Sequence, residues 1–371
     1  MEFSQYVWPL AAFATGATAL FTAVLLVLTK DLHGRHSLDS TFGPQRFHTQ
    51  PTPRIGGIAI VCGVLLGTLL IAGESRYILR IIVLAGVPAF AFGLLEDLTK
   101  RVRVSTRLFA TLGSGLLGWF VTGITIADVN VPWLDALLLW TPAAVLFTAF
   151  AVSGVANAFN IIDGFNGLAS GTAVIVLTAM GLLSLHLGDV QVGHVCVMLA
   201  AAVLGFFLVN WPLGKLFLGD GGAYFVGFAI AWVAVLLLQR HPQVSAWCPL
   251  LICAYPVLEV LFSMLRRRQR HLDVGHPDHL HLHSLVMRRV ACQRFPNISR
   301  TLCNSITGAM LWLMTLLPAL WAVSFYDSTP MLMLGLIVYT LGYHALYVRL
   351  VWFRWNRQWW SRPVPILPDS K

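Results

Sequence analysis

Long runs of apolar residues alternate with short polar segments along almost the whole chain. Each run has about 20 mostly apolar residues, enough for an α-helix to cross the hydrocarbon core of a bilayer. Within 107–153, only Gly123 and Pro132 mark a turn. The pattern predicts an all-α, multi-pass membrane protein, whose first run is a transmembrane helix rather than a cleaved signal peptide. Eleven spans are predicted, at residues 7–29, 55–73, 77–95, 107–127, 133–153, 168–187, 193–210, 222–239, 246–265, 304–325 and 331–350.

The composition agrees with a membrane protein. Hydrophobic residues make up 57% of the 371 residues and charged residues 11%, against about 25% charged in a typical soluble domain. The mean hydropathy is +0.74. The six cysteines show no metal or redox spacing and most lie in apolar runs, so we interpret them as reduced core residues. We expect one transmembrane catalytic domain over 1–350 and a basic, Trp-rich cytoplasmic tail over 351–371.

Positive charge is distributed very unevenly between the two sets of loops. Of the 25 Lys and Arg residues, 22 lie in alternate loops and in the C-terminal segment, and only Arg76, Arg80 and Arg240 lie on the opposite side. Because cytoplasmic loops are rich in Lys and Arg, we expect the N-terminus outside and the C-terminus in the cytoplasm. The net charge of +9 then indicates cytoplasmic loops, anionic lipid and an anionic substrate rather than nucleic acid.

The polar clusters all fall on the predicted cytoplasmic side, which places any chemistry there. The first is Glu96–Asp97 in "LLEDLTKR", at the end of the third span. Two adjacent carboxylates repel each other, and a helix C-terminus disfavours negative charge, so one pKa tends to rise. The pair is a candidate general base or metal-side acid. The alternative is a solvated helix end in which Glu96 pairs with Lys100.

The second cluster is "NAFNIIDGFNG", between two long apolar runs. Asn157 and Asn160 are three residues apart, as are Asp163 and Asn166, so each pair shares one side of a helix. Two glycines follow the aspartate and allow close approach of the backbone to a ligand. The next predicted span begins just afterwards, and its free N–H groups suit a phosphate. The alternative is a polar turn satisfied by its own backbone.

The third cluster is "FLGDGGAYFVG", which precedes the eighth predicted span. Asp220 in this motif is a candidate hard oxygen ligand, since Mg²⁺ favours one or two carboxylates together with substrate phosphates and water. The alternative is that Asp220 is only the N-cap of the following helix.

The fourth cluster is "HPDHLHLHSLVMRR", in the longest predicted cytoplasmic loop. His279, His281 and His283 alternate, which places three imidazoles on one side of an extended segment. No cysteine accompanies them and the spacing fits no common zinc motif, so contact with phosphate or nucleotide is the better functional interpretation. A solvated histidine-rich loop is the alternative.

These motifs together resemble one family. With "HTQPTPRIGG", they occur in the order found in the polyprenyl-phosphate N-acetylhexosamine-1-phosphate transferases of glycosyltransferase family 4, and the likeness covers nearly the whole chain. The resemblance implies transfer of a sugar 1-phosphate from a UDP-N-acetylhexosamine to undecaprenyl phosphate, with release of UMP. It also implies a requirement for Mg²⁺ or Mn²⁺ and a place in the bacterial inner membrane. The product would initiate O-antigen or another cell-envelope polysaccharide.

The resemblance also assigns roles to individual residues. Asp220 matches the metal ligand of the family, and Asn160 is expected to assist it. The expected catalytic residues are Glu96, Asp97, Asp163 and Asp220. The expected substrate-binding residues are Arg54, Lys100, Asn157, Asn166, His279, His281 and His283.

The chain departs from the family pattern at four places. Glu96 and Asn166 stand where many members have Asp, and Ser284 replaces the last histidine of a His-x-His-His motif. Gln45 stands near a position where relatives often have Asn. Asp97, Asp163 and Asp220 are all retained, so we expect an active enzyme.

Three alternative functions stay open. The runner-up enzyme is one of the phospho-MurNAc-pentapeptide translocase type. A transporter or flippase of lipid-linked sugars would place charges within mid-membrane helices of both halves, whereas polarity here gathers on one side. A non-catalytic scaffold would release no UMP from a UDP-sugar.

Overall fold

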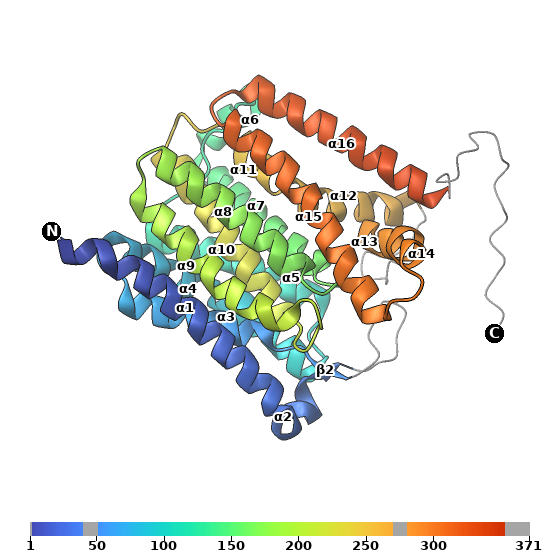
Figure 1. Cartoon of the computed structure of the whole chain (residues 1–371). Coiled ribbons are helices and arrows are strands. Elements are labelled where there is room, and N and C mark those ends of the chain that lie inside the picture. The colour runs from blue at the N-terminus through green and yellow to red at the C-terminus, as the bar shows by residue number, and fades with distance from the viewer. Residues whose placement is uncertain (1, 40–50, 270–279, 353–371) are drawn as a thin grey trace.

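The computed structural model describes residues 2–39, 51–269 and 280–352, and these form a bundle of α-helices (Figure 1). The long helices are α1 (Glu2–Leu28), α3 (Gly56–Leu70), α4 (Gly73–Thr99), α5 (Val104–Thr122), α7 (Thr141–Ile162), α8 (Leu168–His186), α9 (Val190–Asn210), α10 (Gly219–Arg240), α12 (Ala254–Gln269), α15 (Arg300–Ser324) and α16 (Thr329–Val351). The short ones are α2 (Lys30–Ser37), α6 (Pro132–Leu138), α11 (Trp247–Ile252), α13 (Leu282–Val286), the π-helix η1 (Met287–Ala291) and α14 (Cys292–Arg294).

The prediction of a multi-pass, all-α membrane protein is confirmed. In the described residues, eight helices are long and apolar enough to cross a membrane: α1, α4, α7, α8, α9, α10, α15 and α16. Three predicted spans differ from this pattern. Residues 55–73 form α3, which has only 15 residues; 107–127 lie mostly in α5, which carries Arg107; and 246–265 are divided at Cys253 into α11 and α12. The number of eleven spans therefore stays a prediction.

The predicted span 133–153 is wrong in its boundaries. Pro132 begins the short helix α6, and the long helix α7 runs from Thr141 to Ile162. The turn before them lies where expected, since Gly123 ends α5 with a φ of +70°. The end of α7 is displaced because Asn157 and Asn160 continue the helix instead of starting a loop. Their side chains have polar partners on neighbouring helices, which removes the cost of placing them in a membrane helix.

Helix α10 lies at the centre of the bundle and is almost wholly buried. It contacts α3, α4 and α7 closely, and at the crossings with α3 and α4 glycines of the two helices face each other. A Cβ added at Gly93 of α4 would lie 2.6 Å from Cα of Gly221. One added at Gly57 of α3 would lie 2.5 Å from Cα of Gly222. Small residues allow this approach of membrane helices, and it brings the first turn of α10 against the last turns of α4.

A short extended segment places Arg54 beside that first turn. Residues Leu38–Asp39 (β1) and Thr52–Pro53 (β2) form an antiparallel pair, with Leu38 opposite Pro53. The N–H of Phe217 donates to the carbonyl of Pro53, and the N–H of Gly56 donates to the carbonyl of Phe217, both at 2.9 Å. These bonds attach the chain on either side of Arg54 to the approach of α10.

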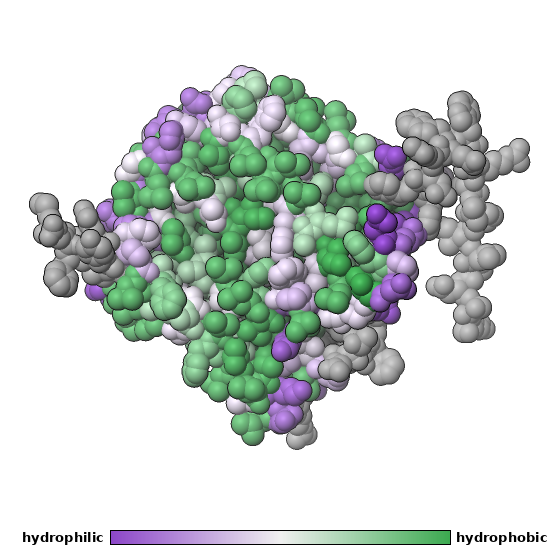
Figure 2. All heavy atoms as spheres, in the orientation of Figure 1, coloured by the Kyte–Doolittle hydropathy of each residue, from purple (hydrophilic) through white to green (hydrophobic). Residues whose placement is uncertain are grey.

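The outer surface is largely apolar. Figure 2 shows hydrophobic residues over much of the visible face, with most of the hydrophilic ones near its margins. Large apolar side chains such as Phe13, Phe120, Phe150 and Leu317 are each more than 60% exposed. Such a surface is stable against lipid tails and costly against water, which agrees with a bilayer as the surrounding medium.

Candidate active site

Asp220 is the centre of a buried polar cluster at one end of the bundle. It lies in the first turn of α10 and is 5% exposed. Its Oδ1 accepts hydrogen bonds from Nδ2 of Asn160 at 3.0 Å and from Nη2 of Arg54 at 3.2 Å. Its Oδ2 is paired with Nη1 of Arg107. Residues from α5, α7, α10 and the segment before α3 therefore converge on one carboxylate.

Asp97 positions this carboxylate by binding the backbone at the start of α10. It is 1% exposed, near the end of α4, and its two oxygens accept the backbone N–H groups of Asp220 and Gly221, each at 2.9 Å. It thus serves as an N-terminal cap of α10, supplied by another helix. Gly219 makes this possible: its φ is +75°, and a Cβ there would lie 2.6 Å from Oδ2 of Asp97. A carboxylate at this position is also favoured by the helix dipole.

Asp163 lies where α7 ends, on the loop that leads to α8, and keeps part of its surface accessible. Loss of hydration raises the pKa of Asp163 to about 7, and the charge of Asp220 adds to the rise. The charge of Arg54 and a hydrogen bond from the N–H of Gly219 oppose it. Asp163 therefore belongs to the same electrostatic cluster as Asp220, and it is more exposed than Asp97 and Asp220.

The two asparagines of α7 have different partners. Oδ1 of Asn160 accepts the hydroxyl of Tyr224 at 3.3 Å, while its Nδ2 is bonded to Asp220. Asn157 lies one turn earlier and donates to Oγ1 of Thr111 at 3.0 Å and to the carbonyl of Ser153 at 2.8 Å. Asn160 is thus part of the cluster, whereas the structure places Asn157 between α5 and α7.

The structure does not bring Asn166 into this cluster. It is 2% exposed, and its N–H donates to Oδ1 of Asn304 at 2.7 Å. Its Nδ2 donates to Oγ of Ser305 at 3.1 Å. Both partners lie on α15, so Asn166 joins the start of α8 to α15.

Glu96 and Lys100 lie at the end of α4, next to Asp97. Oε2 of Glu96 accepts the N–H of Val102 at 2.8 Å, and Nζ of Lys100 donates to the carbonyl of Asp97 at 2.6 Å. Lys100 has a φ of +57° and ends the helix. These contacts hold the turn between α4 and α5, which positions Arg107 toward Asp220. The Glu96–Lys100 ion pair, the alternative interpretation of this motif, is replaced by two contacts to the backbone.

A second polar group surrounds Glu259 on α12. This residue is fully buried, and its Oε1 accepts hydrogen bonds from Nδ1 of His281 at 2.9 Å and from the N–H of Leu282 at 3.0 Å. Its Oε2 accepts the hydroxyl of Tyr343 at 2.7 Å. The carboxylate thereby fixes the start of α13 and the plane of the His281 ring.

His283 connects this group to the loop of Asp163. The rings of His281 and His283 stack with centroids 5.1 Å apart and planes 7° apart. The ring of Phe165 lies 4.9 Å from that of His283. A Cβ added at Gly164 would lie 3.5 Å from Nε2 of His283, so the glycine leaves room for the imidazole. The prediction for His279 lies outside the described residues, as does the position of Gln45.

Sequence reasoning missed three residues of the site: Arg107, Tyr224 and Glu259. Glu259 carried a usable signal, since it is a single carboxylate within the apolar run 246–265. Ionisable residues inside membrane segments are costly and usually have a function. Arg107 was counted only as a loop charge. Tyr224 follows Asp220 by four residues, one helical turn, and could have been placed on the same face.

Comparison with known proteins agrees with this arrangement. The profile of "Glycosyl transferase family 4" matches residues 79–238. A probable undecaprenyl-phosphate N-acetylglucosaminyl 1-phosphate transferase of Bacillus subtilis is 28% identical over 245 residues, covering 66% of this chain and 68% of its own. The undecaprenyl-phosphate alpha-N-acetylglucosaminyl 1-phosphate transferases of Yersinia pestis and Escherichia coli K12 are 26% and 27% identical. They cover 72% and 78% of this chain, and 74% and 80% of their own.

The chain is thus similar to glycosyl transferase family 4 over residues 79–238 and to these transferases over two thirds or more of their length. The matched region of the family runs from α4 to the end of α10, so it contains Asp97, Asp163 and Asp220. The Glu259–His281 group lies beyond it in the sequence and adjoins it in space through Phe165 and His283. The acidic centre thus lies in the central helices, and the histidines come from the C-terminal part.

Proposed function

We propose that this protein transfers N-acetylhexosamine 1-phosphate from a UDP-sugar to undecaprenyl phosphate and releases UMP. The reaction would initiate a cell-envelope polysaccharide such as an O-antigen. The observation that carries the proposal is the Asp220 carboxylate, bonded to Arg54, Arg107 and Asn160 at one end of a membrane bundle. The match to the family model and the activities of the three relatives support it.

The residues present fit a divalent cation. Asp163 and Asp220 supply hard oxygen atoms within one electrostatic cluster, and Asn160 lies beside them. The described residues contain no group of three or more His, Cys, Asp or Glu side chains placed to hold a metal. Mg²⁺ does not require one, because it takes one or two carboxylates and completes its shell with phosphates and water. Asp220, with Asn160, would hold Mg²⁺ or Mn²⁺, which when bound offsets the charge of the diphosphate.

Side chains of this protein would bind the phosphates during the transfer. An oxygen of the lipid phosphate forms a bond to the β-phosphorus of the UDP-sugar, and the bridging bond to the α-phosphate breaks, so the electron pair leaves with UMP. Arg54 and Arg107 can contact phosphate oxygens and balance their charge. The second pKa of a phosphate is about 6, so the acceptor is mostly ionised at pH 7 and needs little help from a base.

The roles of two aspartates follow from their contacts. Asp97 uses both oxygens to hold the first turn of α10, which fixes Asp220 in place. Asp163 is more accessible, and its pKa of about 7 suits it to take the last proton of the acceptor phosphate. We therefore assign positioning to Asp97 and proton transfer or metal contact to Asp163.

We further propose that the site faces the cytoplasm from the bacterial inner membrane. The excess of Lys and Arg in the loops at the site end supports this orientation. UDP-sugars are made in the cytoplasm, so this orientation also gives the donor access.

The test is release of UMP by the purified protein, with Mg²⁺, undecaprenyl phosphate and a panel of UDP-sugars that includes UDP-MurNAc-pentapeptide. We expect UMP only when a UDP-N-acetylhexosamine and the lipid phosphate are both present. Release with the pentapeptide donor alone would favour the translocase-type enzyme. Absence of UMP with every donor, while Asp220→Asn protein behaves identically, would overturn the proposal in favour of a transporter or scaffold.

A further inference from the structure

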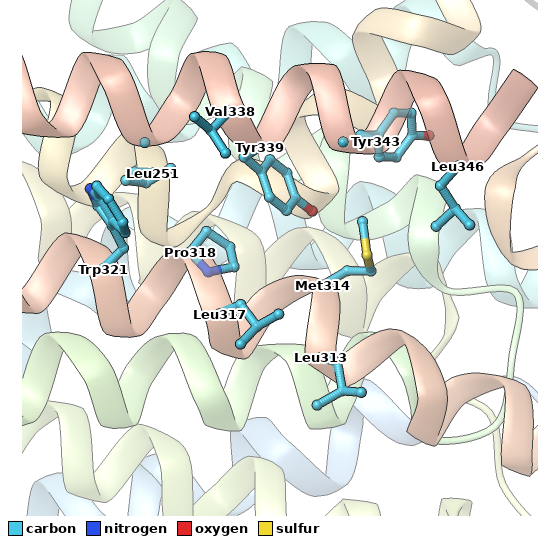
Figure 3. Close-up of a pocket in the computed structure, with 12 residues that line it drawn as sticks. Leu251, Leu313, Met314, Leu317, Pro318, Trp321, Val338, Tyr339, Tyr343 and Leu346 are labelled. Atoms are coloured by element: carbon cyan, nitrogen blue, oxygen red, sulfur yellow. The ribbon is translucent and has the colours of Figure 1, made fainter.

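The apolar cavities of the bundle do not suit a charged ligand. The groove between α15 and α16 has a volume of about 310 Å³, and Figure 3 shows hydrocarbon and aromatic side chains on both of its sides. A second cavity, of about 320 Å³, is lined in part by α7 and α10. Neither lining contains a charged side chain. The polar cluster around Asp220, in contrast, offers both signs of charge to a ligand.

The carboxylate of Asp220 is bonded to two positive side chains at once. Its Oδ2 is paired with Nη1 of Arg107, and its Oδ1 accepts Nη2 of Arg54 at 3.2 Å. Nδ2 of Asn160 also donates to Oδ1, at 3.0 Å. Both oxygens of the proposed metal ligand are therefore engaged. A divalent cation that arrives alone has to approach two guanidinium groups that carry charge of its own sign.

These charges lie in a part of the protein with little access to water. The side chain of Asp220 is 7% exposed and that of Arg107 is 16% exposed. Solvent and salt screen such charges less than they screen charges on the surface. Nη2 of Arg54 also lies 3.9 Å from Oδ1 of Asp97. Two guanidinium groups thus oppose the two buried carboxylates, which lowers the attraction of this place for a free cation.

The fold directs Arg107 toward Asp220 but leaves one of its donors without a partner. Arg107 lies in the first turn of α5, after the turn that Glu96 holds through the N–H of Val102. Its Nε is buried and has no hydrogen-bond partner in the described residues. A buried donor without a partner costs free energy. A diphosphate has several acceptor oxygens, and a guanidinium can donate to them from two nitrogens at once, so a phosphate could supply this partner.

We propose that Arg107, assisted by Arg54, keeps Asp220 from binding a divalent cation until a diphosphate is present. Phosphate oxygens accept the donors of the two guanidinium groups, and the carboxylate is then available to the cation that accompanies the diphosphate. The diphosphate substrate therefore enters as its metal complex, and the protein alone binds the metal weakly. That this diphosphate belongs to a UDP-sugar rests on the proposed function.

The first experiment measures binding of Mn²⁺ alone to the purified full-length protein, from the electron paramagnetic resonance signal of the free ion. We expect weak binding by the parent protein and binding about tenfold tighter by Arg107→Gln, because a like charge next to the ligand is removed. Addition of Asp220→Asn to Arg107→Gln should abolish this gain. Arg103→Gln is the matched control: it removes the same charge from an exposed side chain four residues earlier and should leave the affinity unchanged.

The second experiment measures binding of UDP to the same proteins by calorimetry, with EDTA present to remove metal. We expect Arg107→Gln to bind UDP about tenfold more weakly than the parent protein, because a charged donor to the phosphates is lost. The variant should therefore bind the metal more tightly and the diphosphate more weakly. A merely misfolded variant would lose affinity for both, so the opposite signs distinguish release of Asp220 from structural damage.

Three results would overturn the proposal. The first is an affinity for Mn²⁺ that is unchanged or lower in Arg107→Gln. The second is an equal gain in Arg103→Gln, which would indicate a general effect of net charge. The third is a gain that persists with Asp220→Asn, which would place the cation on another group.

Failure of the proposed function would give a different pattern. Absence of UDP binding in every protein, with the gain in Mn²⁺ affinity retained in Arg107→Gln, would count against a UDP-sugar as the substrate. The control of Asp220 by Arg107 would remain in force, and pyrophosphate would replace UDP as the probe. Unchanged binding of pyrophosphate in Arg107→Gln would then refute the part of the proposal that concerns the diphosphate.

Discussion

The carboxylate of Asp97 accepts the backbone N–H of Asp220 at 2.9 Å, although the two residues are 123 positions apart in the chain. Its second oxygen accepts the N–H of Gly221 at the same distance. One buried aspartate therefore sets the position of another. Asp97, near the end of α4, acts on the site through the start of α10.

Replacement of Asp97 by Asn should lower both stability and turnover. The amide keeps one acceptor oxygen but presents an N–H₂ group to a backbone N–H, so one buried hydrogen bond is lost at a cost of about 1–3 kcal/mol. Turnover should fall by orders of magnitude because Asp220 is displaced. Thermal unfolding in detergent and UMP release measure the two effects. Glu96→Gln, which keeps its acceptor for the N–H of Val102, is the control. Lost turnover at unchanged stability would show that Asp97 acts on substrate directly.

Replacement of Asp220 by Asn should weaken the response to Mg²⁺. The change removes the negative charge that Arg54 and Arg107 share and one oxygen ligand of the proposed metal. We expect the Mg²⁺ concentration for half-maximal UMP release to rise by roughly 10- to 100-fold or more. Tyr224→Phe, which removes a neighbouring hydroxyl without altering charge, should change it far less. An unchanged Mg²⁺ titration in Asp220→Asn would remove this residue from the metal site.

The pH dependence of turnover should report the ionisation of Asp163. Its pKa is raised to about 7, chiefly by loss of hydration, so the protonated form dominates below neutrality. If the ionised form is required, turnover should increase as the pH passes upward through about 7. Higher Mg²⁺ should move this limb to lower pH, since a cation favours the carboxylate. Asp163→Asn should lose the limb, and its persistence would assign the titration to another group.

The same raised pKa has a consequence for stability. In the folded protein Asp163 holds its proton at pH values where the unfolded chain has already released it, so its contribution to stability is lost as the pH rises through about 7. The free energy of unfolding should be measured for Asp163→Asn and for the parent protein without Mg²⁺. The variant's value minus the parent's should therefore be larger at pH 8 than at pH 5. An equal difference at the two pH values would contradict this reasoning.

Glu259 and His281 should behave as one unit. Glu259 contacts the imidazole and the N–H of Leu282, so Glu259→Gln should reduce turnover through His281. In a double-mutant cycle with His281→Asn, we expect kcat/KM of the double variant to be close to that of the worse single variant. The coupling should amount to about 0.5–3 kcal/mol. Glu259→Asp should recover part of the loss, and strictly additive effects would show that the two residues act independently.

The sequence by itself determined the class of this protein and the residues of its acidic centre. Runs of about 20 apolar residues predict membrane helices. Lipid provides no hydrogen-bond partner for backbone N–H and C=O groups, and an α-helix pairs these groups within the segment. Polar groups next to such runs need hydrogen-bonding or charged partners, since removing each of them from water costs free energy. The motifs of Asp97, Asp163 and Asp220 could therefore be recognised without coordinates.

The tertiary structure alone decided what each polar group contacts. Asn157, Asn160 and Asn166 look equivalent in the sequence, yet only Asn160 reaches Asp220. Glu259 joins His281 across 22 positions, and Arg107 joins Asp220 across 113. Spacing along one helix determines which residues share a face, but the crossing of helices determines which faces meet. Here that crossing depends on glycines of α3, α4 and α10, whose missing side chains let the backbones approach and bring distant charges together.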